Sequence, residues 1–156
     1  MITQDEANYL LNLHKQRIDE KRVQFPLKGS KLSIQLESCD KKIYFLLDIN
    51  NTPNLNSKIT YQTRNTDSVV LVRLDINGAH RNPFVEKPPL PQFKPFNGES
   101  IVGTHIHFYV EKYKDSWAIP LSAINPDLND DYELLEYFYS ISSIIKPPIF
   151  EYGFAI

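Results

Sequence analysis

The chain has 156 residues, of which 42% are apolar and 23% are charged, so it is long enough for one domain with a hydrophobic core. The net charge of −2 does not indicate a general nucleic-acid-binding protein, and no apolar run approaches the roughly 20 residues of a membrane helix. Cys39 is the only cysteine, which excludes an internal disulfide, and the N-terminus lacks the pattern of a signal peptide. We therefore expect a single domain over residues 1–156, away from membranes and located in the cytoplasm.

The charge is distributed unevenly along the chain. From Pro126 onward six acids stand against the single base Lys146, which gives −5, and the remainder carries 16 bases and 13 acids, or +3. A mildly basic body with an acidic C-terminal segment is compatible with a local phosphate site.

The first residues have the pattern of a helix. Thr3 and Glu6 form a capping box, and apolar residues then recur at helical spacing as far as Ile18. This predicts an N-terminal helix from Gln4 to Arg22.

Alternating polar and apolar residues predict a series of strands after Pro26 and Gly29. Most of them are expected to pair as antiparallel neighbours. They cover Leu32–Leu36, Ile43–Ile49, Ile59–Arg64, Val69–Ile76, Gly103–Glu111 and Trp117–Leu121.

A long segment at about residues 78–98 contains five prolines interleaved with aromatic residues. Such a connection is either a functional flap that meets a partner or a surface loop whose phenylalanines pack into the core. After the last strand, Asn129 is predicted to cap a helix from Asp130 to Ser143. The predicted fold class is α+β, with an N-terminal helix, a C-terminal helix and a curved antiparallel sheet of five or six strands.

The apolar sets of the strands must share the buried face of this sheet, because each strand can bury only one face. They are residues 43/45/47/49, 70/72/74/76 and 106/108/110. The opposite face then collects two histidines, two arginines and several tyrosines, if the strands are neighbours. An ordinary solvated face would carry Lys, Glu, Thr and Ser instead.

These residue types fit the cleavage of RNA through its own 2′-hydroxyl. The reaction needs a base, an acid and a fixed cation for the charge that grows on phosphorus. We predict proton transfer by His105 and His107, phosphate binding by Arg64 and Arg73, and a third acid or base in His80. The predicted substrate-binding residues are Tyr109, Tyr44, Gln62, Asn82 and Asp75.

Other interpretations of the same residues stay open. His105 and His107 are also a possible zinc pair with His80 or Asp75 as third ligand, although the chain has neither a Cys partner nor an HExxH motif. Arg73 and Asp75 are also compatible with a structural ion network. We predict no metal and no cofactor.

Three elements carry a resemblance to a known group of proteins. They are the stretch from Arg73 to Pro83 (RLDINGAHRNP), the strand THIHFY that begins at Thr104, and the WAIPL stretch that begins at Trp117. Over about residues 58–121 the chain resembles small uncharacterised proteins of Gram-positive bacteria and their mobile elements, which carry LDING-HRNP, HIHxY and WAxPL elements. The overall plan also resembles that of small metal-independent endoribonuclease toxins.

The leading hypothesis is therefore a cytoplasmic, metal-independent endoribonuclease or RNA-processing protein in a toxin or phage–host conflict. An anti-CRISPR protein that cuts guide RNA is one form of it. The second hypothesis is a non-enzymatic inhibitor of the anti-CRISPR type that binds a protein or a protein–RNA complex through the same face and the flap. The third is a zinc-dependent hydrolase.

Overall fold

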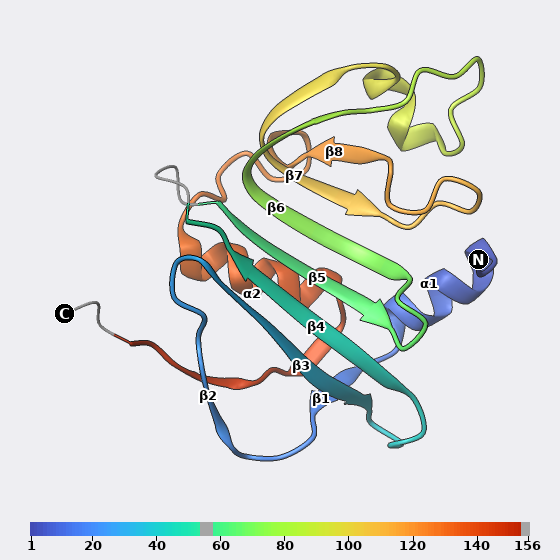
Figure 1. Ribbon diagram of the computed structural model, residues 1–156. Coiled ribbons are helices and arrows are strands. Elements are labelled where there is room, and N and C mark those ends of the chain that lie inside the picture. The colour runs from blue at the N-terminus through green and yellow to red at the C-terminus, as the bar shows by residue number, and fades with distance from the viewer. Residues whose placement is uncertain (54–57, 154–156) are drawn as a thin grey trace.

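The computed structural model describes residues 1–53 and 58–153, and within them the chain forms one large curled sheet with helices on one side (Figure 1). The longer strands lie in the middle of the chain. They are β3 (Ser30–Ser38), β4 (Tyr44–Asn51), β5 (Ile59–Asn65), β6 (Val70–Arg81) and β7 (Ser100–Phe108). The short strands are β1 (Lys15–Arg17), β2 (Arg22–Gln24), β8 (Ala118–Pro120), β9 (Ile144–Lys146) and β10 (Ile149–Glu151).

Eight of these strands form a mixed sheet in the order β8-β7-β6-β5-β4-β3-β1-β9. Neighbours are antiparallel except for β1 and β9, which are parallel. A second sheet in the described residues consists of β2 and β10, also parallel. The predicted fold class was therefore wrong, because the protein is mostly sheet and the sheet is larger than five or six strands and is not purely antiparallel. The additional strands come from the stretches 15–24 and 144–151, which the sequence patterns assigned to a helix and a tail.

The N-terminal helix α1 covers Gln4–Asn12 and does not continue to Arg22 as predicted. It begins as expected, with the Thr3 side chain accepting a hydrogen bond from the Glu6 amide. It ends because Lys15 turns back and its Nζ donates to the carbonyls of Leu11 and Leu13 at 3.0 and 2.9 Å. The next residues instead pair with β3 and β9, so tertiary pairing overrides their helical spacing.

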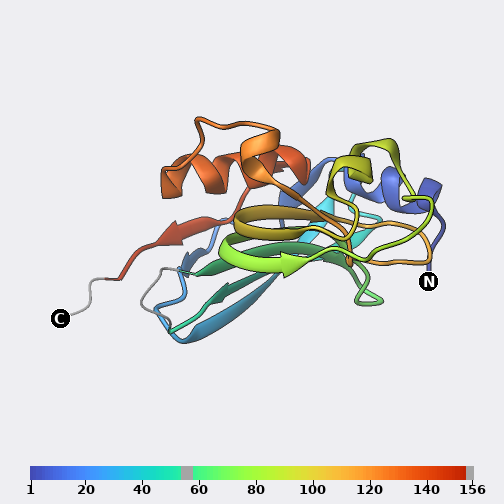
Figure 2. The ribbon, with the colours of Figure 1, turned by 90° about the horizontal axis from the view of Figure 1, so that it is seen from above.

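The main core lies between the sheet and the two helices, α1 and α2 (Asp131–Ile141), which Figure 2 shows on the same side of the strands. Apolar positions of β4, β6 and β7 predicted to face inward are buried there, among them Leu47, Leu74 and Ile106. Helix α2 contributes Phe138, whose ring stacks on Tyr61 with centroids 5.7 Å apart. The opposite face of β3 to β6 is left open toward the viewer in Figure 1.

The segment at 78–98 is not structureless. Strand β6 continues into it as far as Arg81, and a short 3-10 helix, η1, covers Pro91–Phe96. Phe93 is fully buried in a second, smaller core with Trp117, Ile119 and Val110, whereas Phe84 is 83% exposed. The segment is thus largely a packed cover whose aromatic residues fold back, the second of the two alternatives above.

Two shorter segments differ in detail from the expectation. The C-terminal helix is capped by Asp130 and not by Asn129, and the Asp130 side chain accepts from the amides of Tyr132 and Glu133. After β8, another 3-10 helix, η2, covers Leu121–Ala123.

None of the helices in the described residues has the length and apolar character that a bilayer crossing requires.

Candidate functional site

Two rows of side chains run across the open face of the sheet, because directly opposite residues of neighbouring strands share a face. The register of β3 to β7 defines both rows. The first consists of Ser33, Asp48, Gln62, Arg73 and His107, and the second of Lys31, Asn50, Thr60, Asp75 and His105. The assumption that these strands are neighbours is thus confirmed, and both rows end on a histidine of β7.

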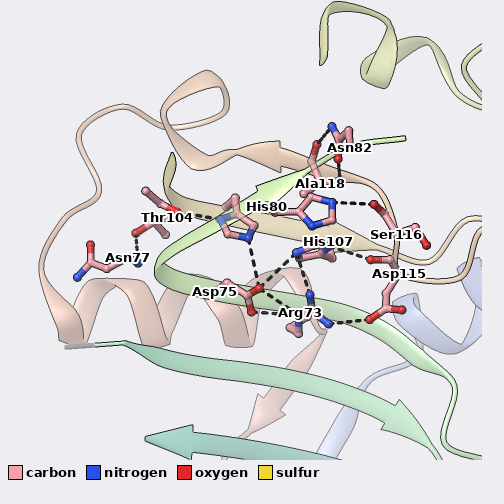
Figure 3. Close-up of polar contacts among 12 residues, drawn as sticks. Arg73, Asp75, Asn77, His80, Asn82, Thr104, His107, Asp115, Ser116 and Ala118 are labelled. Carbon is pink, nitrogen blue, oxygen red and sulfur yellow. Dashed lines mark hydrogen bonds and ion pairs between the residues drawn. The ribbon is translucent and has the colours of Figure 1, made fainter. Parts of the chain in front are cut away.

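Arg73 is held by three partners at once (Figure 3). Its Nε donates to Asp75 Oδ1 at 3.0 Å, its Nη1 to Asp115 Oδ2 at 2.7 Å, and its Nη2 lies 2.9 Å from His107 Nε2. Two carboxylates already neutralise the guanidinium, and its donors point at protein groups. This arrangement leaves Arg73 little capacity to bind a phosphate and instead makes it a positioning group for Asp75 and His107.

The two histidines of β7 are fixed by their Nδ1 atoms. His105 Nδ1 donates to the Gly103 carbonyl and His107 Nδ1 to the Asp115 carbonyl, both at 2.8 Å. A carbonyl can only accept, so each Nδ1 carries the hydrogen, and the guanidinium of Arg73 can only donate to His107 Nε2. Each ring therefore directs its Nε2 atom toward the same carboxylate.

That carboxylate is Asp75, whose Oδ2 lies 3.3 Å from both Nε2 atoms. Together the three ligand atoms lie within 4.8 Å of one another. His105 Nε2 is fully buried and forms no hydrogen bond with any described residue. Two ring nitrogens and a carboxylate oxygen facing one point repel one another unless a cation lies among them or a ring nitrogen carries a second proton and donates to Asp75.

The local electrostatics favour a cation at this point. Burial alone would raise the pKa of Asp75, but the contacts with His105 and His107 and the charge of Arg73 hold it well below its usual range. Asp75 is therefore ionised at neutral pH. With Arg73 as the one cation against Asp75 and Asp115, the group carries a net charge of −1 when its imidazoles are neutral.

His80 joins this group from the far side of a bulge in β6. The register between β6 and β7 shifts between Asp75 and Gly78, where Asn77 has a φ of 56°. The bulge brings the His80 ring to 4.6 Å from that of His107, and its Nε2 donates to the Ser116 carbonyl at 2.8 Å. Figure 3 shows its other nitrogen on the side of His107. Burial, together with the neighbouring His107, lowers the pKa of His80.

Gly78 is required by the approach of His105. A Cβ at this position would lie 3.0 Å from His105 Cε1, closer than ordinary van der Waals contact. The imidazoles are also shielded from solvent, with 1% of His105 and none of His107 exposed. We call Arg73, Asp75, His80, His105, His107 and Asp115 the histidine cluster. Because its two central rings are buried, neither can transfer a proton directly to a substrate on the open face in this conformation.

A shallow depression of about 440 Å³ crosses the open face beside the cluster, and we call it the polar groove. It reaches Arg73 and Asp75 at one end and Lys31 at the other. Arg64 lies in it, but its Nε donates to Asp48 at 2.6 Å, and Asp48 also accepts from Gln62 and Ser33. Predicted residues Arg64 and Gln62 are therefore brought to the groove, each already bound to Asp48.

Three predicted substrate-binding residues lie elsewhere. Strand β7 ends at Phe108, so Tyr109 leaves the alternation and packs in the main core with its hydroxyl donating to the Ile2 carbonyl. Tyr44 begins β4 and does not line the polar groove. Asn82 is buried, and its side chain forms two hydrogen bonds with the backbone of Ala118. Its Nδ2 donates to the Ala118 carbonyl and its Oδ1 accepts from the Ala118 amide, so Asn82 attaches the 78–98 segment to β8.

Two residues of the site were not identified from the sequence. Asp115 lies in the turn after β7 and Gly78 at the bulge, and neither has a periodic signal in the sequence. The LDING-HRNP element itself was the available hint, since Asp75, Gly78 and His80 all belong to it.

Residues 2–144 match the model of a family of unknown function (DUF6978), and the chain belongs to this family. Neither the curated proteins nor the solved structures contain a match to it.

Proposed function

We propose that this protein is a hydrolase that works at a divalent metal ion, with zinc as the best fit, bound by Asp75, His105 and His107. The observation that carries the proposal is the meeting of their three ligand atoms. Zinc bonds of about 2.0–2.1 Å in a tetrahedron place neighbouring ligand atoms about 3.3 Å apart. Two of the three pairs match this spacing, since both Nε2 atoms lie 3.3 Å from Asp75 Oδ2, and all three ligand atoms lie within 4.8 Å of one another.

The surroundings of the three ligands support the same proposal. Histidines that bind metals usually donate their other ring nitrogen to a carbonyl or a carboxylate, which fixes the ring and its tautomer. His105 and His107 both do so, to Gly103 and to Asp115. A metal would also pair His105 Nε2, which is buried without a hydrogen-bond partner among the described residues.

The chemistry proposed for this centre is hydrolysis of a phosphodiester bound in the polar groove. A metal ion lowers the pKa of a bound water enough to supply hydroxide near neutral pH. The water oxygen forms a bond to phosphorus, the bond to the leaving oxygen breaks, and the leaving oxygen takes up a proton. A metal held by His107 Nε2 would replace the contact of that atom with Arg73, and Arg73 would keep its bonds to Asp75 and Asp115 at the edge of the polar groove.

One observation favours a second candidate, the metal-independent RNA-processing protein. Arg73 already donates to His107 Nε2, so that atom is satisfied without a metal. In this alternative the cluster is a structural network, and the open face binds RNA in the cytoplasm with or without cleaving it. The burial of His105 and His107 argues against direct proton transfer by their rings.

Metal stoichiometry is the first test. Protein stripped with a chelator and incubated with Zn²⁺ or Mn²⁺ is desalted, and its metal content is measured by mass spectrometry. We expect one zinc per chain for wild type and for the control His14→Ala, whose side chain is exposed outside the cluster. We expect loss of the zinc in Asp75→Asn and in His105→Ala.

Hydrolysis of bis(p-nitrophenyl) phosphate and of RNA should then depend on the added metal and stop in EDTA. Cleavage of RNA that is undiminished in EDTA would support the metal-independent candidate. A wild-type protein that retains no metal would refute the metal centre.

A further inference from the structure

A second hollow continues the polar groove beyond β3. It measures about 500 Å³ and lies between β3 and the loop and strand around β2. The two depressions share Leu32 and Ser33, so they adjoin at β3, and we call the pair the track. It is open here because β1 pairs only with residues 36–38 of β3, leaving the edge of residues 31–35 uncovered. We call this second depression the basic hollow, after Arg17, Lys21 and Arg22 in its lining.

We propose that this track binds a single-stranded nucleic acid that lies across the strands, with its backbone on the basic hollow and one phosphate at Asp75. The placement of that phosphate rests on the proposed hydrolase, whereas the binding itself does not. Between β3 and β6 the track crosses three strand spacings, or about 14 Å, and the basic hollow extends it further. This is room for several nucleotides.

The charges along the track favour a polyanion. Six bases line the two depressions (Arg17, Lys21, Arg22, Lys31, Arg64 and Arg73) against three acids (Asp19, Asp48 and Asp75). Five of the six acidic residues of the C-terminal segment lie on or before α2, which covers the other face of the sheet (Figure 2), and the sixth, Glu151, lies on β10 beside Arg22. The molecule is thus polarised, with the bases on the side of the track.

The bases at the far end are the available ones. Lys21 and Lys31 are exposed, and their amino groups form no ion pair with any described residue. Arg22 is 71% exposed and lies 3.7 Å from Glu151, a loose pair that a phosphate can displace. Arg17, Arg64 and Arg73 are already bound to carboxylates. The two unpaired lysines and the loosely paired Arg22 predict a dependence of log K on log salt with a slope of about −2 for a single strand.

The track has no aromatic side chain among its lining residues. Stacking platforms for bases are therefore missing from this described part of the chain, and binding should depend on the backbone. We expect little preference for base sequence.

The test uses a fluorescently labelled 12-nucleotide single-stranded RNA, the same sequence as DNA, and its duplex. Binding is measured by anisotropy with wild-type protein in EDTA at several salt concentrations. We expect single strands to bind with the salt slope given above. The double variant Lys21→Glu/Arg22→Glu and the variant Lys31→Glu should each weaken binding at least tenfold.

The control is Lys87→Glu/Lys94→Glu, two exposed lysines of the 78–98 segment outside the track, which should change binding less than twofold. The RNA and DNA arms identify which strand is preferred, and either preference supports the proposal. Equal weakening by the control, no binding at low salt, or equally tight binding of a poly-glutamate peptide would overturn it.

Binding and cleavage measured on the same protein distinguish this inference from the proposed hydrolase. Binding in EDTA without any metal-dependent cleavage refutes the hydrolase and leaves the track in place. Metal-dependent cleavage of RNA with a KM unchanged in Lys31→Glu refutes the track and leaves the hydrolase in place.

Discussion

Substitution of Gly78 is the most specific perturbation of the histidine cluster, because a side chain at this position would contact only one proposed metal ligand closely, His105. In Gly78→Ala the new Cβ would lie 3.0 Å from His105 Cε1, whereas ordinary contact begins at 3.4 Å. The imidazole must therefore move by about 0.4 Å, roughly twice the variation that ligand distances tolerate. Its Nδ1 bond to Gly103, at 2.8 Å, resists that movement.

We expect Gly78→Ala to lower zinc affinity by about 10- to 100-fold, or roughly 1.4–2.7 kcal/mol, the usual effect of disturbing the support of a ligand. The free energy of unfolding should fall by only about 1 kcal/mol, since overpacking is partly offset by the reduced entropy of the unfolded chain. Zinc affinity is measured by competition with a chromophoric chelator, and unfolding by urea.

The control is the same substitution in a His105→Ala background. With the imidazole removed, the nearest atom within contact range is Asp75 Cβ at 3.5 Å, which is an ordinary contact. Gly78→Ala should then change the residual affinity by less than about twofold. An equal loss in both backgrounds, or no loss in wild type, would contradict the steric effect of position 78 on the metal through His105.

Three further predictions concern stability. Burial lowers the pKa of Lys15 to about 7, below its value in the unfolded chain. As the pH rises, the folded protein therefore loses this proton at a lower pH than the unfolded chain does, and the free energy of unfolding should rise by about 2 kcal/mol between pH 7 and 9. Urea unfolding of Lys15→Met should lack this rise, and an identical rise would exclude Lys15 as its source. Asn82→Leu leaves the N–H and the carbonyl of Ala118 without their Asn82 partner, so it should cost about 3 kcal/mol. A loss below about 1 kcal/mol in urea unfolding would contradict that role. Phe93→Ala should cost about 3–5 kcal/mol in the second core, whereas Phe84→Ala at its exposed position should cost less than about 0.5 kcal/mol; equal losses in thermal unfolding would contradict the burial pattern.

Period-two alternation was sufficient to predict which face of the central strands is buried. Leu47, Leu74 and Ile106 lie in the core as expected, because a strand that buries one face must present the alternate residues on the other. The two rows across the open face follow from the same alternation once strand order is known. Strand order itself depends on contacts between distant residues, so the sequence alone could suggest the meeting of Asp75, His105 and His107 but could not establish it.

Of the five short strands only β8 was predicted, and β1, β2, β9 and β10 were not. β1 and β9 have three residues each, too few for a periodic signal, and they exist because they pair with each other and β1 also pairs with β3. The burial of His105 and His107 could not be predicted from the sequence either, since it depends on the bulge in β6 and on the turn that carries Asp115. Tyr109 shows the converse error, because the predicted strand was extended to Glu111, three residues past the end of β7.

The two rows of directly opposite residues limit how the length of this chain can change. Loss or gain of one residue within β5 would turn its remaining side chains to the other face, placing Gln62 in the core and Tyr61 in the polar groove. Homologues that keep the site should therefore confine insertions and deletions to the connections between strands, such as the loop before η1. The turn at 112–117 is an exception, because its length places Asp115 against Arg73. An alignment of the family would show this as ungapped blocks over β4 to β7, and engineered insertions should be tolerated only outside them.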